Sequence, residues 1–224
     1  MCVLSYNKNI LLFKMVYDIK QIVSSNNKLD PIYRRMVSKC NWVNLYYGIA
    51  SEQIRENDFK KIVEVGIGYG VHAKEMLDNT QLEHLYLVDP SIPYEGDLFS
   101  KDILNNLNGF NNLLKNIYIN LEDHCHRYTH FRQPSLSITN YEIPDNSVDL
   151  VFLDGDHSYD AVSKDLPFWY AKIRPGGFLL GDDYASCHPE TRKAVDEFVS
   201  SNGYFMDLLR KPGNKYPIYK IVKQ

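Results

Sequence analysis

Glu64-Val65-Gly66-Ile67-Gly68-Tyr69-Gly70 closes a short β-branched run that begins at Lys61. This pattern predicts a strand that ends in a glycine-rich turn, because glycine permits a tight reversal and lets a ligand lie against the backbone. A helix-like segment follows, from about Val71 to Leu77. The spacing is GxGxG and not the GxGxxG of dinucleotide-binding folds, which favours a ligand without a pyrophosphate.

Beyond this turn, apolar strand patterns alternate with helical ones. The expected strands cover 61–65, 84–88, 128–132, 147–153 and 178–180, and the expected helices cover 113–126, 160–170 and 189–200. This alternation predicts an α/β fold with a doubly wound, Rossmann-like sheet and helices on both faces. Two last strands, 204–209 and 218–222, predict a C-terminal antiparallel hairpin and seven strands in all.

Other segments show weaker patterns. Residues 1–58 are expected to form an N-terminal helical extension, with residues 59–224 as the main domain. Asp30-Pro31 predicts a helix start, because aspartate accepts free amide bonds and proline fits the first turn. The polar, Asn-rich stretch 91–112 predicts a long loop with at most one helical turn, and 174–177 predicts a tight turn.

Composition limits the possible functions. The chain has 224 residues, 44% of them hydrophobic and 24% charged, which is typical of a globular domain. Its net charge of −3 argues against a general nucleic-acid binder. Four dispersed cysteines without a CxxC pair favour reduced thiols in the cytoplasm. The apolar run Ile10–Phe13 is too short for a signal peptide or a membrane span, so we expect no membrane association.

Polar residues follow the predicted central strands, which end at Gly66, Asp89, Asp154 and Asp182. Ligands of such sheets bind outside the carboxyl ends of the strands, so these residues should converge on one crevice. Asp89 lies 23 residues after Gly66, where a carboxylate can bind the two hydroxyls of a ribose. Its alternative role is a cap before Pro90.

Four carboxylates, Asp154, Asp156, Asp182 and Asp183, are expected at the ends of two neighbouring strands. Unpaired carboxylates repel one another at close range, and a hard cation such as Mg²⁺ would relieve this repulsion. Such a cation could bind a substrate hydroxyl and lower its pKa. In the alternative interpretation, Asp156 caps the helix that starts near Ser158, and Asp182 or Asp183 faces solvent or the adenosine side.

His157 is the first candidate for a general base, because histidine exchanges protons near neutral pH. Its alternative role is packing or capping at a helix start. Tyr159, Tyr184 and His188 rank second. Tyr46 and Tyr47 either line a pocket or pack in the core, whereas Trp42 and Trp169 are expected in the core. His124 and His126 are two residues apart and would point apart on a helix, which argues against a metal site.

These motifs resemble those of class I S-adenosylmethionine-dependent methyltransferases over roughly residues 40–224. The glycine turn matches the first motif of that family, Asp89 matches the acid that closes its second strand, and Pro175-Gly176-Gly177 precedes its fifth strand. The resemblance implies S-adenosylmethionine as cofactor and methyl transfer as reaction. The expected cofactor-binding residues are Glu64, Gly66, Gly68, Tyr69, Gly70, Asp89, Ser135 and Asp154.

Within that family, Phe152–Tyr159 together with Gly181–Tyr184 looks like the macrolide-sugar O-methyltransferase subgroup. This resemblance implies divalent-metal ligands at Asp154, Asp182 and Asp183, with Mg²⁺ as the expected ion, and catalytic roles for Asp154 and His157. The implied acceptor is a hydroxyl of a small molecule, first a sugar or glycoside and second a phenol or catechol. Residues 91–127 do not align with the family.

Three other functions stay open at this point. Asp154-Gly155-Asp156 after an apolar strand is typical of DxD phosphatases, but their nucleophile strand usually opens the domain. A nicotinamide-binding protein is disfavoured by the GxGxG spacing. A non-catalytic partner subunit would have no need of carboxylates at two strand ends. A homodimer is also compatible with the sequence.

Overall fold

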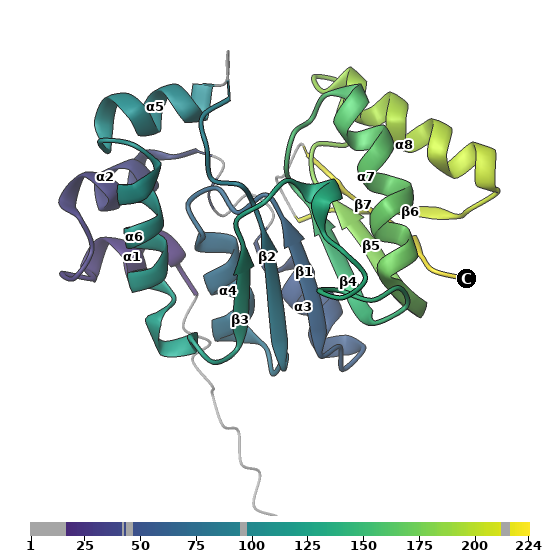
Figure 1. Cartoon of the computed structure of the whole chain (residues 1–224), viewed down its shortest axis with the longest axis horizontal. Coiled ribbons are helices and arrows are strands. Elements are labelled where there is room, and N and C mark those ends of the chain that lie inside the picture. Colours follow the sequence, from purple (N-terminus) through teal and green to yellow (C-terminus); the bar gives the residue numbers. More distant parts are fainter. Residues whose placement is uncertain (1–16, 42, 44–46, 95–97, 212–215) are drawn as a thin grey trace, which may run out of the picture.

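The computed structural model describes residues 17–41, 43, 47–94, 98–211 and 216–224 (Figure 1). Its strands are β1 (Lys61–Val65), β2 (His84–Val88), β3 (Tyr128–Phe131), β4 (Val148–Leu153), β5 (Ile173–Gly181), β6 (Met206–Leu209) and β7 (Ile218–Val222). They form one sheet in the order β3-β2-β1-β4-β5-β7-β6. Strands β1 to β5 pair in parallel, and β7 is antiparallel to both β5 and β6. The predicted doubly wound sheet with a terminal antiparallel pair is therefore confirmed.

Helices cover both faces of the sheet, as the alternation of side chains along each strand requires. Ile62 and Phe152 face a core shared with α1 (Ile19–Ser25), α2 (Pro31–Lys39), α3 (Ile49–Glu56), α4 (Val71–Asn79), α5 (Leu98–Asn106) and α6 (Phe110–Asn120). Val63 and Val151 face a second core shared with α7 (Tyr159–Lys172) and α8 (Pro189–Asn202). In Figure 1, α7 and α8 accordingly lie together, apart from α1, α2, α5 and α6.

The N-terminal helices begin as the sequence predicts. Asp30 caps α2 by accepting the amide of Ile32 at 2.7 Å, and Pro31 occupies the first turn. The buried Tyr33 of α2 donates its hydroxyl to the carbonyl of Tyr69 at 2.5 Å. Helix α2 therefore supports the glycine turn directly.

The prediction for residues 91–126 is partly wrong. The expected loop contains α5, and the expected helix begins earlier and ends at Asn120, followed by a short 3₁₀ turn at Glu122–His124. Asparagine usually favours turns because its side chain competes for backbone groups. Here, Asn112 donates to the carboxylate of Asp30 at 3.2 Å and Asn116 accepts the backbone amide of Asp30 at 2.7 Å, so these asparagines join segments that lie far apart in the sequence.

The predicted turn at 174–177 lies within the bounds of β5. Val148 pairs with Ile173 and Leu150 with Phe178, so this stretch leaves the regular ladder as a bulge. Gly176 there has a φ of 80°, which glycine adopts easily. In the part of the chain that the structure describes, no helix has the length and apolar character needed to span a membrane.

The sheet order creates a switch point at its centre. Strand β1 pairs with β2 on one side and with β4 on the other, so the connections leave in opposite directions. In open α/β sheets this is where the crevice for ligands lies. The ends of β1, β2, β4 and β5 therefore position the candidate site.

Candidate functional site

The glycine turn packs tightly against the end of β4. Gly66, Gly68 and Gly70 have positive φ values of 82°, 48° and 69°. A Cβ atom on Gly66 would overlap the backbone carbonyl of Asp154, and one on Gly70 would crowd the side chain of Ile117. Gly66 is thus required by the protein's own backbone as well as by the turn.

Asp89 joins the end of β2 to this turn. Its Oδ2 accepts the amide of Ile67 at 2.9 Å, and its Oδ1 accepts the amide of Ser91 at 2.6 Å. The second bond is the local cap that the sequence leaves as an alternative, and the first ties the carboxylate to the glycine turn. The structure therefore brings two predicted cofactor-binding elements together at the switch point.

Glu64 is buried at the end of β1 beside His72 of α4. His72 Nδ1 lies 2.9 Å from Glu64 Oε1, and the ring of Tyr47 stacks on His72 with centroids 5.0 Å apart. Burial raises the pKa of Glu64 even though His72 opposes this shift. Tyr47 is 4% exposed and belongs to the core, whereas Tyr46 and Trp42 lie outside the described residues. The sequence analysis missed His72. No motif marks this residue, and its only signal is its position two residues after the glycine turn.

Ser135, the remaining predicted cofactor residue, takes part in an internal chain of hydrogen bonds. The indole of the buried Trp169 donates to Ser135 Oγ at 2.7 Å, and that hydroxyl donates to Asp165 at 2.6 Å. Burial raises the pKa of Asp165 to about 6, although the bond from Ser135 opposes this shift. The role of Ser135 in cofactor binding stays a prediction.

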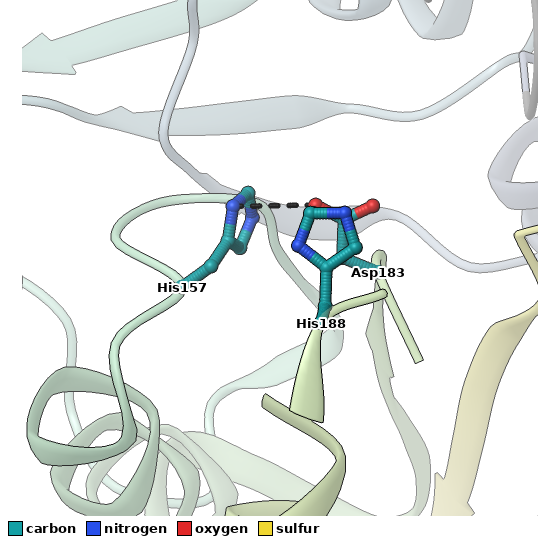
Figure 2. Close-up of side chains that lie close together, drawn as sticks. All are labelled: His157, Asp183 and His188. Atoms are coloured by element: carbon teal, nitrogen blue, oxygen red, sulfur yellow. Dashed lines mark ion pairs between the residues drawn. The ribbon is translucent and has the colours of Figure 1, made fainter. Parts of the chain in front are cut away.

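Acidic and imidazole groups meet at the ends of β4 and β5. Figure 2 shows the side chains of His157, Asp183 and His188 close together. Nδ1 of His157 lies 3.3 Å and Nδ1 of His188 lies 3.5 Å from Asp183 Oδ2. The other ring nitrogen of His157, Nε2, lies 3.5 Å from Asp154 Oδ1, which is an ion-pair separation rather than a well-formed hydrogen bond. We name His157, Asp183 and His188 the His–Asp–His cluster.

Helix α8 holds this cluster against the β4–α7 loop. His188 is the N-cap residue of α8 and makes no side-chain capping bond. Thr191 in the first turn donates to the carbonyl of His157 at 3.1 Å, and Glu190 accepts the amide of Tyr159 at 2.9 Å. The sequence analysis ranks His188 second among the candidate bases. Its position, five residues after Asp183 and directly before a helix-starting proline, is the signal that could have placed it near the end of β5.

The carboxylates around the His–Asp–His cluster raise the pKa of His157. Burial lowers the pKa of an imidazole, but the nearby carboxylates of Asp154, Asp183 and Asp182 outweigh this effect and raise the pKa of His157 to about 9. Burial, reinforced by Asp154 and Asp183, raises the pKa of Asp182. This raised pKa favours the protonated form of His157 at neutral pH, and the role of His157 as general base stays a prediction.

The other predicted candidates have separate partners. The hydroxyls of Tyr159 and Tyr184 each donate to an acid of α8 at 2.5 Å. Asp156 accepts the amide of Ser158 at 2.9 Å, whereas the N-cap residue of α7 is Ser158 itself, which accepts the amide of Ala161. His124 pairs with Asp78 at 2.6 Å, which gives it a structural role outside the crevice.

The metal site predicted at Asp154, Asp182 and Asp183 stays a prediction, and the structure offers a second group of possible ligands. Among the residues that the structure describes, ligand atoms of the His–Asp–His cluster all lie within 4.8 Å of one another. Asp183 belongs to this group, whereas Asp154 and Asp182 do not. The possible ligands in this group are two imidazoles and one carboxylate, whereas the sequence predicts three carboxylates.

Known proteins are similar to this chain in sequence and in fold. A family model described as "Methyltransferase domain" matches residues 63–184. An uncharacterized protein of Acanthamoeba polyphaga mimivirus is 26% identical over 150 residues, which are 65% of this chain and 62% of that protein; the match thus spans less than two thirds of the relative.

Two solved structures have the same fold. An O-methyltransferase from Bacillus cereus in complex with SAH superposes with a TM-score of 0.63 at 11% identity, covering 94% of each chain. M. capricolum TrmK, in complex with S-adenosyl-homocysteine, gives a TM-score of 0.52 at 14% identity and covers 79% of this chain and 69% of its own.

Proposed function

Because this chain belongs to the family of methyltransferase domains, we propose that it moves the methyl group of S-adenosylmethionine to a hydroxyl of a small molecule. The family assignment replaces the DxD phosphatase and the nicotinamide-binding protein as interpretations. The similarity to an O-methyltransferase solved with SAH supports the same cofactor for this fold.

One observation carries the cofactor assignment: the carboxylate of Asp89 accepts the amide of Ile67 at 2.9 Å, across the switch point. A single carboxylate oxygen can accept more than one bond, so Asp89 can hold the glycine turn and still accept a ribose hydroxyl. Gly68, which has a positive φ of 48°, adds no side chain to this turn. The residues present fit the cofactor.

The acceptor hydroxyl would lie near the His–Asp–His cluster. Methyl transfer displaces an excellent sulfonium leaving group, so the protein mainly has to orient the oxygen and remove its proton. Carboxylates at the ends of β4 and β5 can accept hydrogen bonds from that hydroxyl. A divalent cation, when bound, would lower the pKa of the hydroxyl and help to orient it.

Resemblance to the macrolide-sugar subgroup favours a sugar or glycoside as acceptor, with a phenol or catechol as the second candidate. The net charge of −3 suits a small molecule better than nucleic acid. The sequence prediction of Mg²⁺ at Asp154, Asp182 and Asp183, and that of His157 as base, stay predictions.

Calorimetry with S-adenosylhomocysteine tests the cofactor site. Asp89→Ala should weaken binding by at least tenfold, since it removes the charged acceptor and loosens the turn. Asp207→Ala removes an exposed acid of β6 and should leave affinity unchanged. Unchanged affinity in a folded Asp89→Ala protein would reject the assignment. Methyl transfer to a panel of glycosides and phenols would then identify the acceptor class, and a total lack of transfer despite binding would favour a non-catalytic partner subunit.

A further inference from the structure

We propose that the His–Asp–His cluster is a binding site for a divalent transition-metal ion, held by Nδ1 of His157, Nδ1 of His188 and Oδ2 of Asp183. The role of the ion in methyl transfer rests on the proposed function. The binding site itself does not, because it is defined by the side chains of this chain. It differs from the sequence prediction in two of its three ligands and in the kind of ion.

The distances fit such an ion. Nitrogen and oxygen ligands lie about 2.0–2.1 Å from a tetrahedral zinc-like ion, which places them roughly 3.3 Å from one another. The two ring nitrogens lie 3.3 Å and 3.5 Å from Asp183 Oδ2, close to that separation. One ligand atom from each of the three residues lies within 4.8 Å of the other two, so the three side chains can converge on one ion.

The orientation of His157 also fits. A histidine that ligates a metal usually directs its second ring nitrogen at a carboxylate, which fixes the tautomer and the ring. In His157, Nδ1 is directed at Asp183 and Nε2 lies 3.5 Å from Asp154 Oδ1. Asp154 is then a positioning residue for a ligand, and the ring of His157 has no nitrogen left to act as a base.

Two further observations at β5 point to a cation. Asp182 is only 8% exposed, and its Oδ1 is buried without a hydrogen-bond partner among the described residues. A buried carboxylate oxygen is costly unless it is paired, and a nearby cation would offset that cost. Asp183 has a φ of 58°, a strained conformation for a residue with a side chain, and such strain concentrates at functional sites.

The donor set selects the kind of ion. Mg²⁺ prefers oxygen ligands at ideal octahedral geometry and keeps several waters, whereas imidazole suits zinc, iron, nickel and copper. Two imidazoles with one carboxylate therefore favour an ion of the manganese-to-zinc series over Mg²⁺. The same contacts could alternatively be hydrogen bonds from two rings to one carboxylate, and the experiment separates these cases.

Calorimetric titration of the full chain with Co²⁺, Zn²⁺ and Mg²⁺ tests the site. Co²⁺ and Zn²⁺ should bind once per chain, and Mg²⁺ at the same concentration should not displace them. His188→Ala should weaken Co²⁺ binding at least tenfold, since loss of even an outer partner costs 10- to 100-fold. His126→Ala, which removes an exposed histidine outside the cluster, is the matched control and should bind normally.

Proton NMR of the Co²⁺ protein gives a second readout. Each coordinated imidazole should contribute one strongly shifted, exchangeable N–H resonance, and His188→Ala should remove one of the two. His188→Gln serves as a second variant if His188→Ala unfolds. No binding of Co²⁺ or Zn²⁺, or binding that survives His188→Ala but is lost in Asp182→Asn, would overturn the proposal; the second result would restore the three-carboxylate site.

Titration of the chelated protein with S-adenosylhomocysteine keeps the two proposals apart. Cofactor binding without metal binding would overturn this inference and leave the proposed function intact. Metal binding without cofactor binding would support the metal site and overturn the proposed function.

Discussion

Gly66 lies where two strands meet, and its hydrogen atom occupies space that a methyl group cannot enter. Gly66→Ala would place a Cβ atom against the carbonyl of Asp154 at a φ of 82°. We expect the free energy of unfolding to fall by about 2–4 kcal/mol, from backbone strain and overpacking together. Urea denaturation measures this loss.

Gly203 provides the matched control. It also has a positive φ, of 66°, in the left-handed helical region, but a Cβ atom there would meet nothing within 4 Å. Gly203→Ala should therefore cost only the backbone strain, about 1 kcal/mol. Equal losses in the two variants would contradict the tight contact between the glycine turn and β4.

Asp165 should make stability depend on pH. Its pKa is raised to about 6 in the folded protein, against about 3.9 in an unfolded chain, so the folded state holds the proton more tightly. The protonated, neutral carboxyl of Asp165 stabilises the folded state at low pH. This contribution to the free energy of unfolding is lost as the pH rises from about 4 through 6. The full effect is on the order of 3 kcal/mol.

Asp165→Asn removes this titration while keeping an acceptor for Ser135. Relative to the unsubstituted protein, the variant should become more stable as pH increases from 4 to 8. Urea denaturation at several pH values measures the difference between the two proteins. A difference that does not change with pH would show that Asp165 ionises normally.

At the scale of elements, α2 supports the glycine turn through the buried hydroxyl of Tyr33. Tyr33→Phe removes the hydrogen bond from this hydroxyl to the carbonyl of Tyr69. We expect a loss of about 1–2 kcal/mol in stability and weaker binding of S-adenosylhomocysteine, because the turn loses part of its support. Urea denaturation and calorimetry measure the two effects.

Tyr141→Phe is the control for this substitution, because Tyr141 is 96% exposed. It should change neither quantity. If Tyr33→Phe lowers stability but leaves cofactor affinity unchanged, the N-terminal helices support the fold without contributing to the site.

At the scale of the molecule, cofactor binding at the switch point should stabilise the whole fold. A ligand that binds only the folded state at 100 times its Kd adds about 2.7 kcal/mol, or roughly 5–10 °C in Tm for a domain of this size. S-adenosylhomocysteine should produce this shift, whereas NAD and a phosphate analogue should not. A shift with NAD alone would favour a nicotinamide-binding protein.

Much of the fold follows from local pattern. The run 61–65 before three glycines, and the apolar run before Asp154, are short and bounded, so their strands could be placed from sequence. Helix α5 could not, because it buries only Ser100 and Ile103 and leaves no clear apolar stripe. The asparagines beside it bond to groups far away in the chain, which a local pattern does not show.

The candidate site was likewise predictable from the sequence only in part. The sequence by itself determined that Gly66, Asp89, Asp154 and Asp183 follow strands, because alternation and turn residues are local properties. Only the tertiary structure decided that His188 lies beside Asp183 and that Nε2 of His157 faces Asp154. Those placements depend on how α8 packs against the loop after β4, through contacts such as that of Thr191 with His157, and such packing is set by the whole core rather than by neighbours in sequence.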